Sequence, residues 1–186
     1  MKPPSTACSD SRKPVLSTKD PAVARAPTIT AVRYRSGMAH LAAAVNLVTS
    51  DGPAGRAGFT ASAVTSVTDD PATLLVCAKR KGAATPRIVA NGVLCVNVLA
   101  AEHRELSALF GSSTQGGEDR FEGAGWSRLM TGSPALHGAV AVFDCRIANV
   151  VDIGTHSVLF CEVLDVVEEP ERTPLMYFRR AYRVIE

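Results

Sequence analysis

The residues best suited to chemistry lie in one run, Gly58 to Arg80, which reads GFTASAVTSVTDDPATLLVCAKR. Small and hydroxylated residues fill its first half, and no charge occurs before Asp69. A backbone flanked by such residues lets a flat ligand lie close and offers N–H and hydroxyl donors to carbonyls and phosphates. The cation pair Lys79-Arg80 can neutralise a phosphate. The run therefore indicates a site for a flat, phosphate-bearing ligand or, on composition alone, a Thr/Ser-rich hairpin on a half-exposed sheet.

Two common nucleotide-binding motifs are missing. The nearest counterpart of GxGxxG is GAGWSR (Gly123 to Arg128), which lacks the third glycine and follows no strand-to-helix turn. The Gly-rich phosphate loop that ends in Gly-Lys-Ser/Thr does not occur. Neither of these dedicated nucleotide-binding folds is expected.

The cysteines favour a buried role over a chemical one. Their number is odd and no pair has CxxC spacing, which argues against a metal or dithiol site. Four of them lie in apolar, strand-like runs, as small buried hydrophobes do: Cys77, Cys95, Cys145 and Cys161. A reducing cytoplasm is the simplest compartment.

Among the histidines, His156 is the sharpest candidate, because it sits in the tight link IGTHSV between two long apolar runs. His40 and His103 have the pattern of surface or helix residues. His137 follows the turn at Ser133-Pro134 and has no evident partner.

Short strands dominate the expected secondary structure. Apolar and β-branched runs predict strands at 45–49, 73–78, 93–99, 140–151, 157–167, 175–178 and 181–185, the last two joined at Arg179-Arg180. Helices are expected along the Tyr34, Met38 and Leu41 stripe, from a cap at Thr85 to about Gly92, and over 102–110 with Gly111 as its stop. Gly111 to Glu118 reads as a mobile loop near a site. Because parallel crossovers need a helix between strands, this pattern predicts a closed antiparallel β-structure with a few short flanking helices.

Composition predicts one folded domain. Lys and Arg number 20 against 18 for Asp and Glu, so the net charge of +2 excludes a nucleic-acid footprint. No apolar run reaches the roughly 20 residues that span a bilayer. Residues 1–30 are rich in Pro, Ser, Lys and Arg and have no signal-peptide core, which predicts a disordered leader or an arm that packs on a partner subunit. Residues 31–186 form the expected domain.

Several segments together resemble the short-chain flavin reductases, in family order and at family spacing over roughly residues 32–185. The segments are AVNLVTSDGPAGRAG, GFTASAVTSVTDDPATLLVC, LCVNVLAAEHRELSALFG, DRFEGAGW, FDCRI, IGTHSVLFCEV and PLMYFRRAYR. The resemblance implies an FMN-binding split barrel, a closed antiparallel Greek-key barrel, in which the nicotinamide of NADH (or NADPH) stacks on a flavin and passes it a hydride. It further implies FAD, with FMN as the alternative, a cytoplasmic homodimer, and reduced flavin that diffuses to a partner monooxygenase.

The resemblance also implies roles for particular residues. The flavin ring and the start of its phosphate chain are contacted by Thr60, Ala61, Ser62, Ala63 and Ser66, and the ribityl and phosphate region by Cys77, Lys79 and Thr85. His156 lies beside the flavin and nicotinamide rings as the single catalytic candidate, and no metal is implied. The family more often has Asn or Ser at the positions of Lys79 and Lys81, so which cation of Lys79, Arg80 and Lys81 meets phosphate stays open.

The roles of four further aromatic residues can be interpreted in two ways. Phe110, Phe121 and Trp126 are interpreted as core or loop anchors, although the matching region packs near the cofactor in the resembling family. Tyr182 is either a strand packing residue or a wall of the flavin pocket across the dimer.

Two other functions remain open at this point. One is a flavin- or haem-binding split barrel without catalysis, a carrier or sensor, and the other is a flavin-dependent corrinoid reductase. A carrier has no use for a histidine at the nicotinamide face, so His156 favours the enzyme.

Overall fold

The computed structural model describes residues 29–112 and 117–185 of the 186-residue chain. The expected leader 1–30 and the expected mobile loop Gly111 to Glu118 therefore lie largely outside the described residues. The chain divides into two compact units, one that ends at Ser36 and one that begins at Gly37. Helix α1 (Ala31–Met38) begins in the first unit and has no buried residue. The helix expected around Tyr34 is confirmed, whereas Leu41 lies beyond its end.

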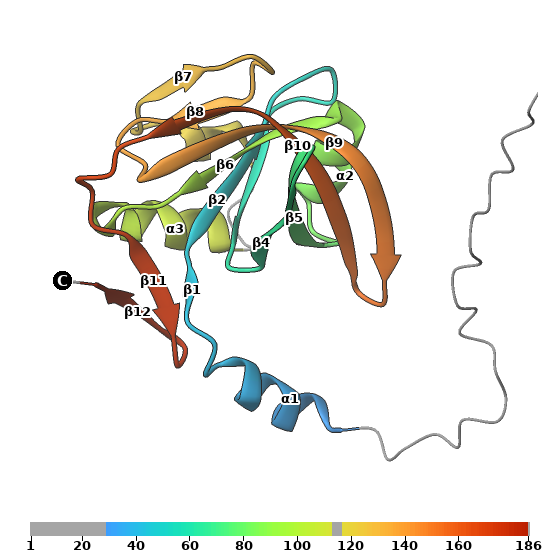
Figure 1. Ribbon diagram of the computed structural model, residues 1–186, viewed down its shortest axis with the longest axis vertical. Helices are drawn as coiled ribbons and strands as arrows, with labels where there is room; N and C mark the ends of the chain where they lie inside the picture. The colour runs from blue at the N-terminus through green and yellow to red at the C-terminus, as the bar shows by residue number, and fades with distance from the viewer. Residues whose placement is uncertain (1–28, 113–116, 186) are drawn as a thin grey trace, which may run out of the picture. The chain divides into compact units, whose positions relative to one another are not determined.

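A seven-stranded sheet forms the second unit's centre, with the spatial order β3-β2-β6-β9-β10-β5-β4 (Figure 1). Every neighbouring pair is antiparallel. The strands are β2 (Asn46–Ser50), β3 (Ala57–Ala61), β4 (Val64–Asp69), β5 (Ala72–Lys79), β6 (Val93–Val98), β9 (Ala141–Ile153) and β10 (His156–Glu168). β9 and β10 form one long hairpin that turns at Gly154, whose φ of 58° favours glycine.

Two smaller sheets complete the β-structure. β1 (Ala43–Ala44), β11 (Leu175–Phe178) and β12 (Ala181–Val184) form one, and β7 (Trp126–Arg128) pairs with β8 (Pro134–Leu136) in the other. The expected C-terminal hairpin is confirmed, with Arg179 and Arg180 both at positive φ, 50° and 62°. Two consecutive left-handed residues match the twist that a two-residue hairpin turn requires.

The mainly antiparallel β-architecture with few helices is as predicted, but the expected closure is not confirmed. β3 and β4 are the two edges of the seven-stranded order, and no ladder joins them within the described residues. They are consecutive in the chain and are linked only by Ser62 and Ala63.

Four short helical segments lie beside the sheets: α2 (Thr85–Asn91), η1 (Ala101–His103), α3 (Arg104–Gly111) and η2 (Glu118–Phe121). α2 ends as predicted, because Gly92 caps it at φ 71°. The prediction that Thr85 caps α2 is wrong: Ala84 occupies the N-cap, and the Thr85 hydroxyl instead donates to the Lys79 carbonyl at 2.9 Å. Gly111 is the last residue of α3 rather than its stop.

The core has two clusters, and the central strands contribute to both. Val48 and Val96 pack in one cluster, while their chain neighbours Leu47 and Cys95 pack in the other. Since neighbouring strand residues point to opposite faces, β2 and β6 are covered on both sides.

The described cysteines are free thiols, as predicted. Cys95, Cys145 and Cys161 are buried, and Cys77 is partly buried. Burial raises the pKa of Cys161 to about 12, so that thiol stays protonated at neutral pH.

Candidate functional site

A groove runs along β3 and is walled by α3 on one side and by the loop after β5 on the other. It consists of two adjoining clefts of about 200 and 440 Å³ that share Thr60 and Gly111. Among the predicted site residues, the structure brings Thr60, Ala61 and Ser62 to the smaller cleft and Thr60, Lys79 and Thr85 to the larger one.

Small side chains leave room in the narrower cleft, and a chain of hydrogen bonds fixes its far wall. The Thr60 hydroxyl donates to the Ser107 carbonyl at 2.7 Å, which ties β3 to α3. The Ser107 hydroxyl lies 2.9 Å from the Tyr182 hydroxyl. Tyr182 in turn packs edge-on against Tyr177, with ring centroids 5.6 Å apart. Tyr182 is therefore a wall of the groove within the same chain.

The wider cleft ends on the loop of residues 79–85, which carries three exposed cations. Lys79 and Lys81 line the cleft, whereas Arg80 does not and pairs with Asp152 at 3.5 Å. This loop is tight: the Gly82 N–H donates to the Lys79 carbonyl at 2.8 Å, and a Cβ at Gly82 would come within 3.0 Å of that oxygen. Thr85 is 4% exposed, and its hydroxyl donates a hydrogen bond to the same Lys79 carbonyl. Thr85 thus holds the loop that presents the lysines.

Phe110 fixes the distance between α3 and β3. Phe110 is 2% exposed, and a Cβ on Gly58 would stand only 2.9 Å from its ring. Only glycine at position 58 allows this approach, because the same Cβ would also stand 3.0 Å from the Val48 carbonyl. Phe110 packs edge-on against Phe121 at 5.0 Å, and Phe121 against Trp126 at 5.1 Å. The interpretation of these aromatics as anchors is confirmed.

The remaining predicted residues are not in the walls of the two clefts. Ala63 follows β3 and accepts a hydrogen bond from the Cys77 N–H at 2.9 Å, and Ser66 is exposed on the edge strand β4. His156 is exposed, with Nδ1 2.9 Å from the Thr155 hydroxyl. It pairs with Lys79 across β10 and β5, so both side chains lie on one face of the sheet, as does Cys77 two residues along.

Three arginines that the sequence alone does not single out line the groove beyond Gly58. Arg56, Arg87 and Arg120 border a further cavity of about 350 Å³, which shares Gly58, Phe110 and Arg120 with the wider cleft. Arg56 and Arg120 stand inside the segments AVNLVTSDGPAGRAG and DRFEGAGW, so the resemblance was a signal that could have found two of them.

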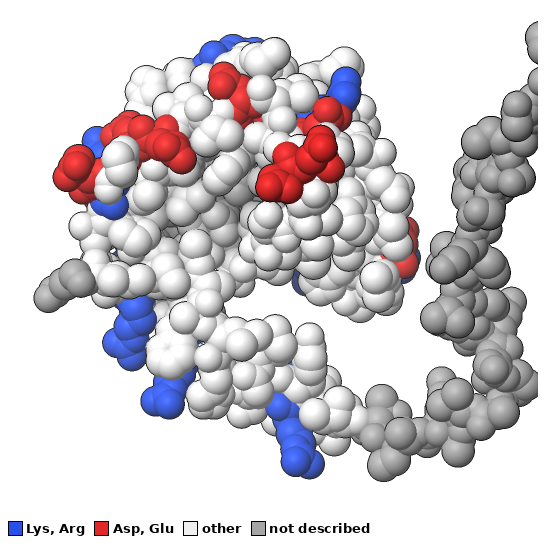
Figure 2. Space-filling model, viewed as in Figure 1, with Lys and Arg blue, Asp and Glu red and all other residues white. Residues whose placement is uncertain are grey.

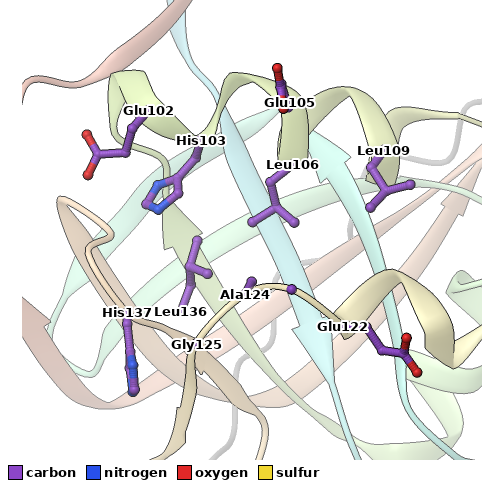
Figure 3. Close-up of a pocket in the computed structure, with 11 residues that line it drawn as sticks. Glu102, His103, Glu105, Leu106, Leu109, Glu122, Ala124, Gly125, Leu136 and His137 are labelled. Carbon is purple, nitrogen blue, oxygen red and sulfur yellow. The ribbon is translucent and has the colours of Figure 1, made fainter.

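A separate cavity of about 450 Å³ lies against the other face of α3 (Figure 3). Leu106 and Leu109 point from α3 into it, whereas Glu102, Glu105 and Glu122 make its border acidic. His103 also lines it, and its Nδ1 accepts the Ala100 N–H at 3.2 Å. Burial lowers the pKa of His103, so its ring is neutral near pH 7. His103 is thus a helix-start residue, in line with its sequence pattern.

Charge is otherwise dispersed over the surface. Figure 2 shows acidic and basic side chains in small separate groups on the face in view, with most of that surface uncharged. In the groove the balance is different, because the described residues that line the wider cleft and the arginine cavity include five cations and no carboxylate. An anion is therefore favoured there.

Comparison with known proteins identifies the family. A family model described as a flavin reductase like domain matches residues 38–186. The chain belongs to this family. The FMN reductase (NADH) RutF of Ancylobacter novellus is 54% identical over 162 residues, which cover 87% of this chain and 89% of that protein. The corresponding Stutzerimonas stutzeri protein is 56% identical over 149 residues, covering 80% and 85%.

Solved structures agree with the flavin reductase fold. BorF, the flavin reductase component of a bacterial two-component tryptophan halogenase, matches with a TM-score of 0.78 at 28% identity, covering 84% of this chain and 98% of that one. The NADH:FAD oxidoreductase SgcE6 of Streptomyces globisporus C-1027, in complex with NAD and FAD fragments, matches with a TM-score of 0.77 at 26% identity, covering 83% and 92%.

The donor set of the groove fits the flavin that this family's name implies. A strip of small residues borders a flat space, hydroxyls face it, and cations stand at one end. Among the described side-chain atoms, Arg120 Nε is buried without a hydrogen-bond partner, and Arg120 lines the wider cleft. Within the described residues, no cluster of metal-ligating side chains occurs and no helix has the length and apolarity to cross a bilayer.

Proposed function

We propose that this flavin reductase like protein oxidises NADH and reduces a flavin bound along β3. The observation that carries the proposal is the groove itself, which joins a narrow strip of small residues to a cationic end. The relatives at 54% and 56% identity are both named FMN reductase (NADH), which supports the same pair of substrates here.

The bound flavin supplies the redox chemistry by accepting a hydride from the nicotinamide. The chain's own contribution is position and exclusion of water. Thr60, Ala61 and Ser62 border the ring and the start of the phosphate-bearing chain in the narrower cleft. Ala63 and Ser66, which lie outside its wall, contact the ring from the turn after β3 and from β4. Cys77, Lys79 and Thr85 serve the ribityl and phosphate end, with Thr85 acting through the loop it holds. His156 orients the nicotinamide.

In this proposal the two clefts along β3 bind the ring, the ribityl chain and the first phosphate, which FMN and FAD have in common. The resemblance of the sequence to the short-chain flavin reductases implies FAD, while the named relatives are FMN reductases. Both flavins are therefore substrates to be compared directly, and the second phosphate of FAD becomes a separate structural question.

One face of the sheet supports a homodimer in this proposal. Cross-strand rows place Cys77 beside Val158 and Val151, and Leu75 beside Phe160, all on the face that also carries His156. These side chains are only partly covered, and Val151 is 39% exposed. A partly exposed apolar face of this kind is what a second copy covers. Fully active monomers in light scattering would contradict the dimer.

Residues 31–186 form the reductase domain in this proposal, a split barrel of antiparallel strands. The protein works in the cytoplasm, and its reduced flavin diffuses to a monooxygenase. A separate enzyme component that receives reduced flavin is supported by BorF, the flavin reductase component of a two-component tryptophan halogenase.

One assay tests the proposed activity. Anaerobic NADH consumption is followed by absorbance with FMN, FAD and riboflavin in turn, beside a blank without flavin. We expect oxidation that depends on added flavin. A protein that binds flavin and leaves NADH untouched in every arm is a carrier or sensor instead.

A further inference from the structure

The arginine cavity continues the groove beyond the wider cleft. It is bordered by Arg56, Arg87 and Arg120, and the loop residues Ala83 and Ala84 line both it and the wider cleft. The groove therefore has two cationic stretches in sequence, first Lys79 and Lys81 and then the three arginines.

Two of the arginines are held by the aromatic pair under the groove. The Arg56 guanidinium lies 5.3 Å from the Phe121 ring centroid, and the Arg120 guanidinium lies 6.0 Å from that of Phe110. The two rings are themselves 5.0 Å apart. Stacking on neighbouring rings restricts both guanidiniums, so less freedom is lost when they bind an anion.

The positive charge of this stretch is only partly compensated. Asp51 accepts from Arg56 at 3.4 Å, but it also pairs with Arg128 at the shorter distance of 2.9 Å. Arg87 is exposed, and no described carboxylate pairs with it. Arg120 donates one bond to the Ser112 carbonyl at 3.1 Å, while its buried Nε has no partner. A buried donor of this kind is costly unless a ligand accepts its hydrogen bond.

We propose that Arg56, Arg87 and Arg120 form a second phosphate-binding site, which takes the adenylate-side phosphate of a dinucleotide. Guanidiniums match phosphate oxygens in paired hydrogen bonds. FMN has one phosphate and the lysine stretch serves it, so a second cationic stretch along the same groove fits a pyrophosphate. The inference rests on the proposed function, since FAD and NADH both carry this group.

Equilibrium binding distinguishes the two sources. Calorimetric titrations measure the Kd of FMN, of FAD, and of NAD⁺ added to FMN-saturated protein. The variants are Arg87→Gln, on an exposed side chain, and Arg120→Gln. Arg146→Gln is the matched control, because Arg146 is exposed, pairs with Glu162 and does not line the groove. Circular dichroism checks that each variant is folded.

If the arginines form this site, Arg87→Gln and Arg120→Gln should raise the Kd of the dinucleotide about tenfold more than the Kd of FMN. This factor corresponds to the loss of one charge-assisted hydrogen bond. A selective effect on FAD assigns the site to the flavin's adenylate, and a selective effect on NAD⁺ assigns it to the nicotinamide dinucleotide. Equal changes for FMN and both dinucleotides, no change in Arg87→Gln, or the same change in Arg146→Gln overturn the inference. Wild-type protein that fails to oxidise NADH with any flavin refutes the proposed function instead, whatever the titrations give.

Discussion

The two faces of α3 differ in chemistry although they belong to the same eight residues. Ser107, Phe110 and Gly111 face the groove, where cations gather, whereas Leu106 and Leu109 face a cavity with an acidic border. The cavities are of similar size, about 440 Å³ for the wider cleft and 450 Å³ for the acidic cavity. Size therefore does not tell which of them binds a nucleotide.

Two properties distinguish the cavity that suits a nucleotide: the sign of the charge at its border, and small residues that let a ligand come close to the backbone. The groove has small residues along a strand, a glycine that lets an aromatic ring close in, and free cationic donors. The acidic cavity repels phosphate, because Glu105 and Glu122 border it. A helix with about 3.6 residues per turn presents side chains three and four apart on one face, so two patterns can share one short segment.

Phe110→Ala should have the largest effect, because the ring is the contact between α3 and β3. Truncating a buried phenylalanine costs about 3–5 kcal/mol. Leu109→Ala, on the half-buried cavity face of the same helix, is the control and should cost less. Urea unfolding of both variants measures the difference. Equal losses would show that the groove side of α3 is no better packed than the cavity side.

The strands and the anchors could be predicted from the sequence because their signals are local. The β-branched runs of β6, β9 and β10 specify strands by themselves, and Gly92 ends α2 where a left-handed residue is needed. The sequence misplaces the role of Thr85 because a hydroxyl before Pro86 has the pattern of a cap. The competing acceptor, the Lys79 carbonyl, comes from a tight turn that only the fold brings near.

The arginines of the groove have no local signal of their own, although the segments that carry the family resemblance include Arg56 and Arg120. Arg56, Arg87 and Arg120 are far apart in the chain and look like ordinary surface charges. They meet because Phe110 and Phe121 stack under two of them, a tertiary contact without a local motif. The small residues at 60–63, by contrast, are contiguous and could be recognised directly.

His156→Ala tests how far the groove extends along the sheet face. If His156 orients the nicotinamide, its loss removes one contact worth about 1–3 kcal/mol, which is roughly tenfold to a hundredfold in kcat/KM for NADH. Flavin Kd should change much less. Stopped-flow reduction under anaerobic conditions separates the two. Full NADH efficiency with a lowered Tm would make His156 a turn residue paired with Thr155.

Lys79→Gln and Glu122→Gln test the charge contrast with substitutions of opposite sign. Lys79 is exposed, so its loss should weaken FMN binding by only about 0.5–1 kcal/mol, roughly twofold to fivefold, and should reduce the dependence of Kd on salt. Glu122→Gln should leave the FMN Kd within error. Fluorescence titration at two ionic strengths measures both. If Glu122→Gln changed the FMN Kd more than Lys79→Gln does, the phosphate would lie on the acidic-cavity side of α3.

The smallest effect concerns pH and His103 on the cavity side. Burial lowers the pKa of His103, with Glu102, Arg172 and Glu169 as its charged neighbours, so the unfolded chain binds the proton more readily than the folded one. This histidine's contribution to stability is complete above the unfolded pKa of about 6.5 and is lost as pH falls from there through the lower folded pKa, by at most about 1.4 kcal/mol per pH unit for one proton.

His103→Gln isolates that contribution, because a glutamine three residues into the helix can still accept the Ala100 N–H. The free energies of unfolding of wild type and variant, measured with urea between about pH 7.5 and 5, should converge toward low pH. Only the wild type loses the contribution that the neutral imidazole makes to stability. FMN affinity should have the same pH dependence in both, because the ring faces the acidic cavity and not the groove. A pH-dependent difference in FMN affinity would instead couple the two faces of α3.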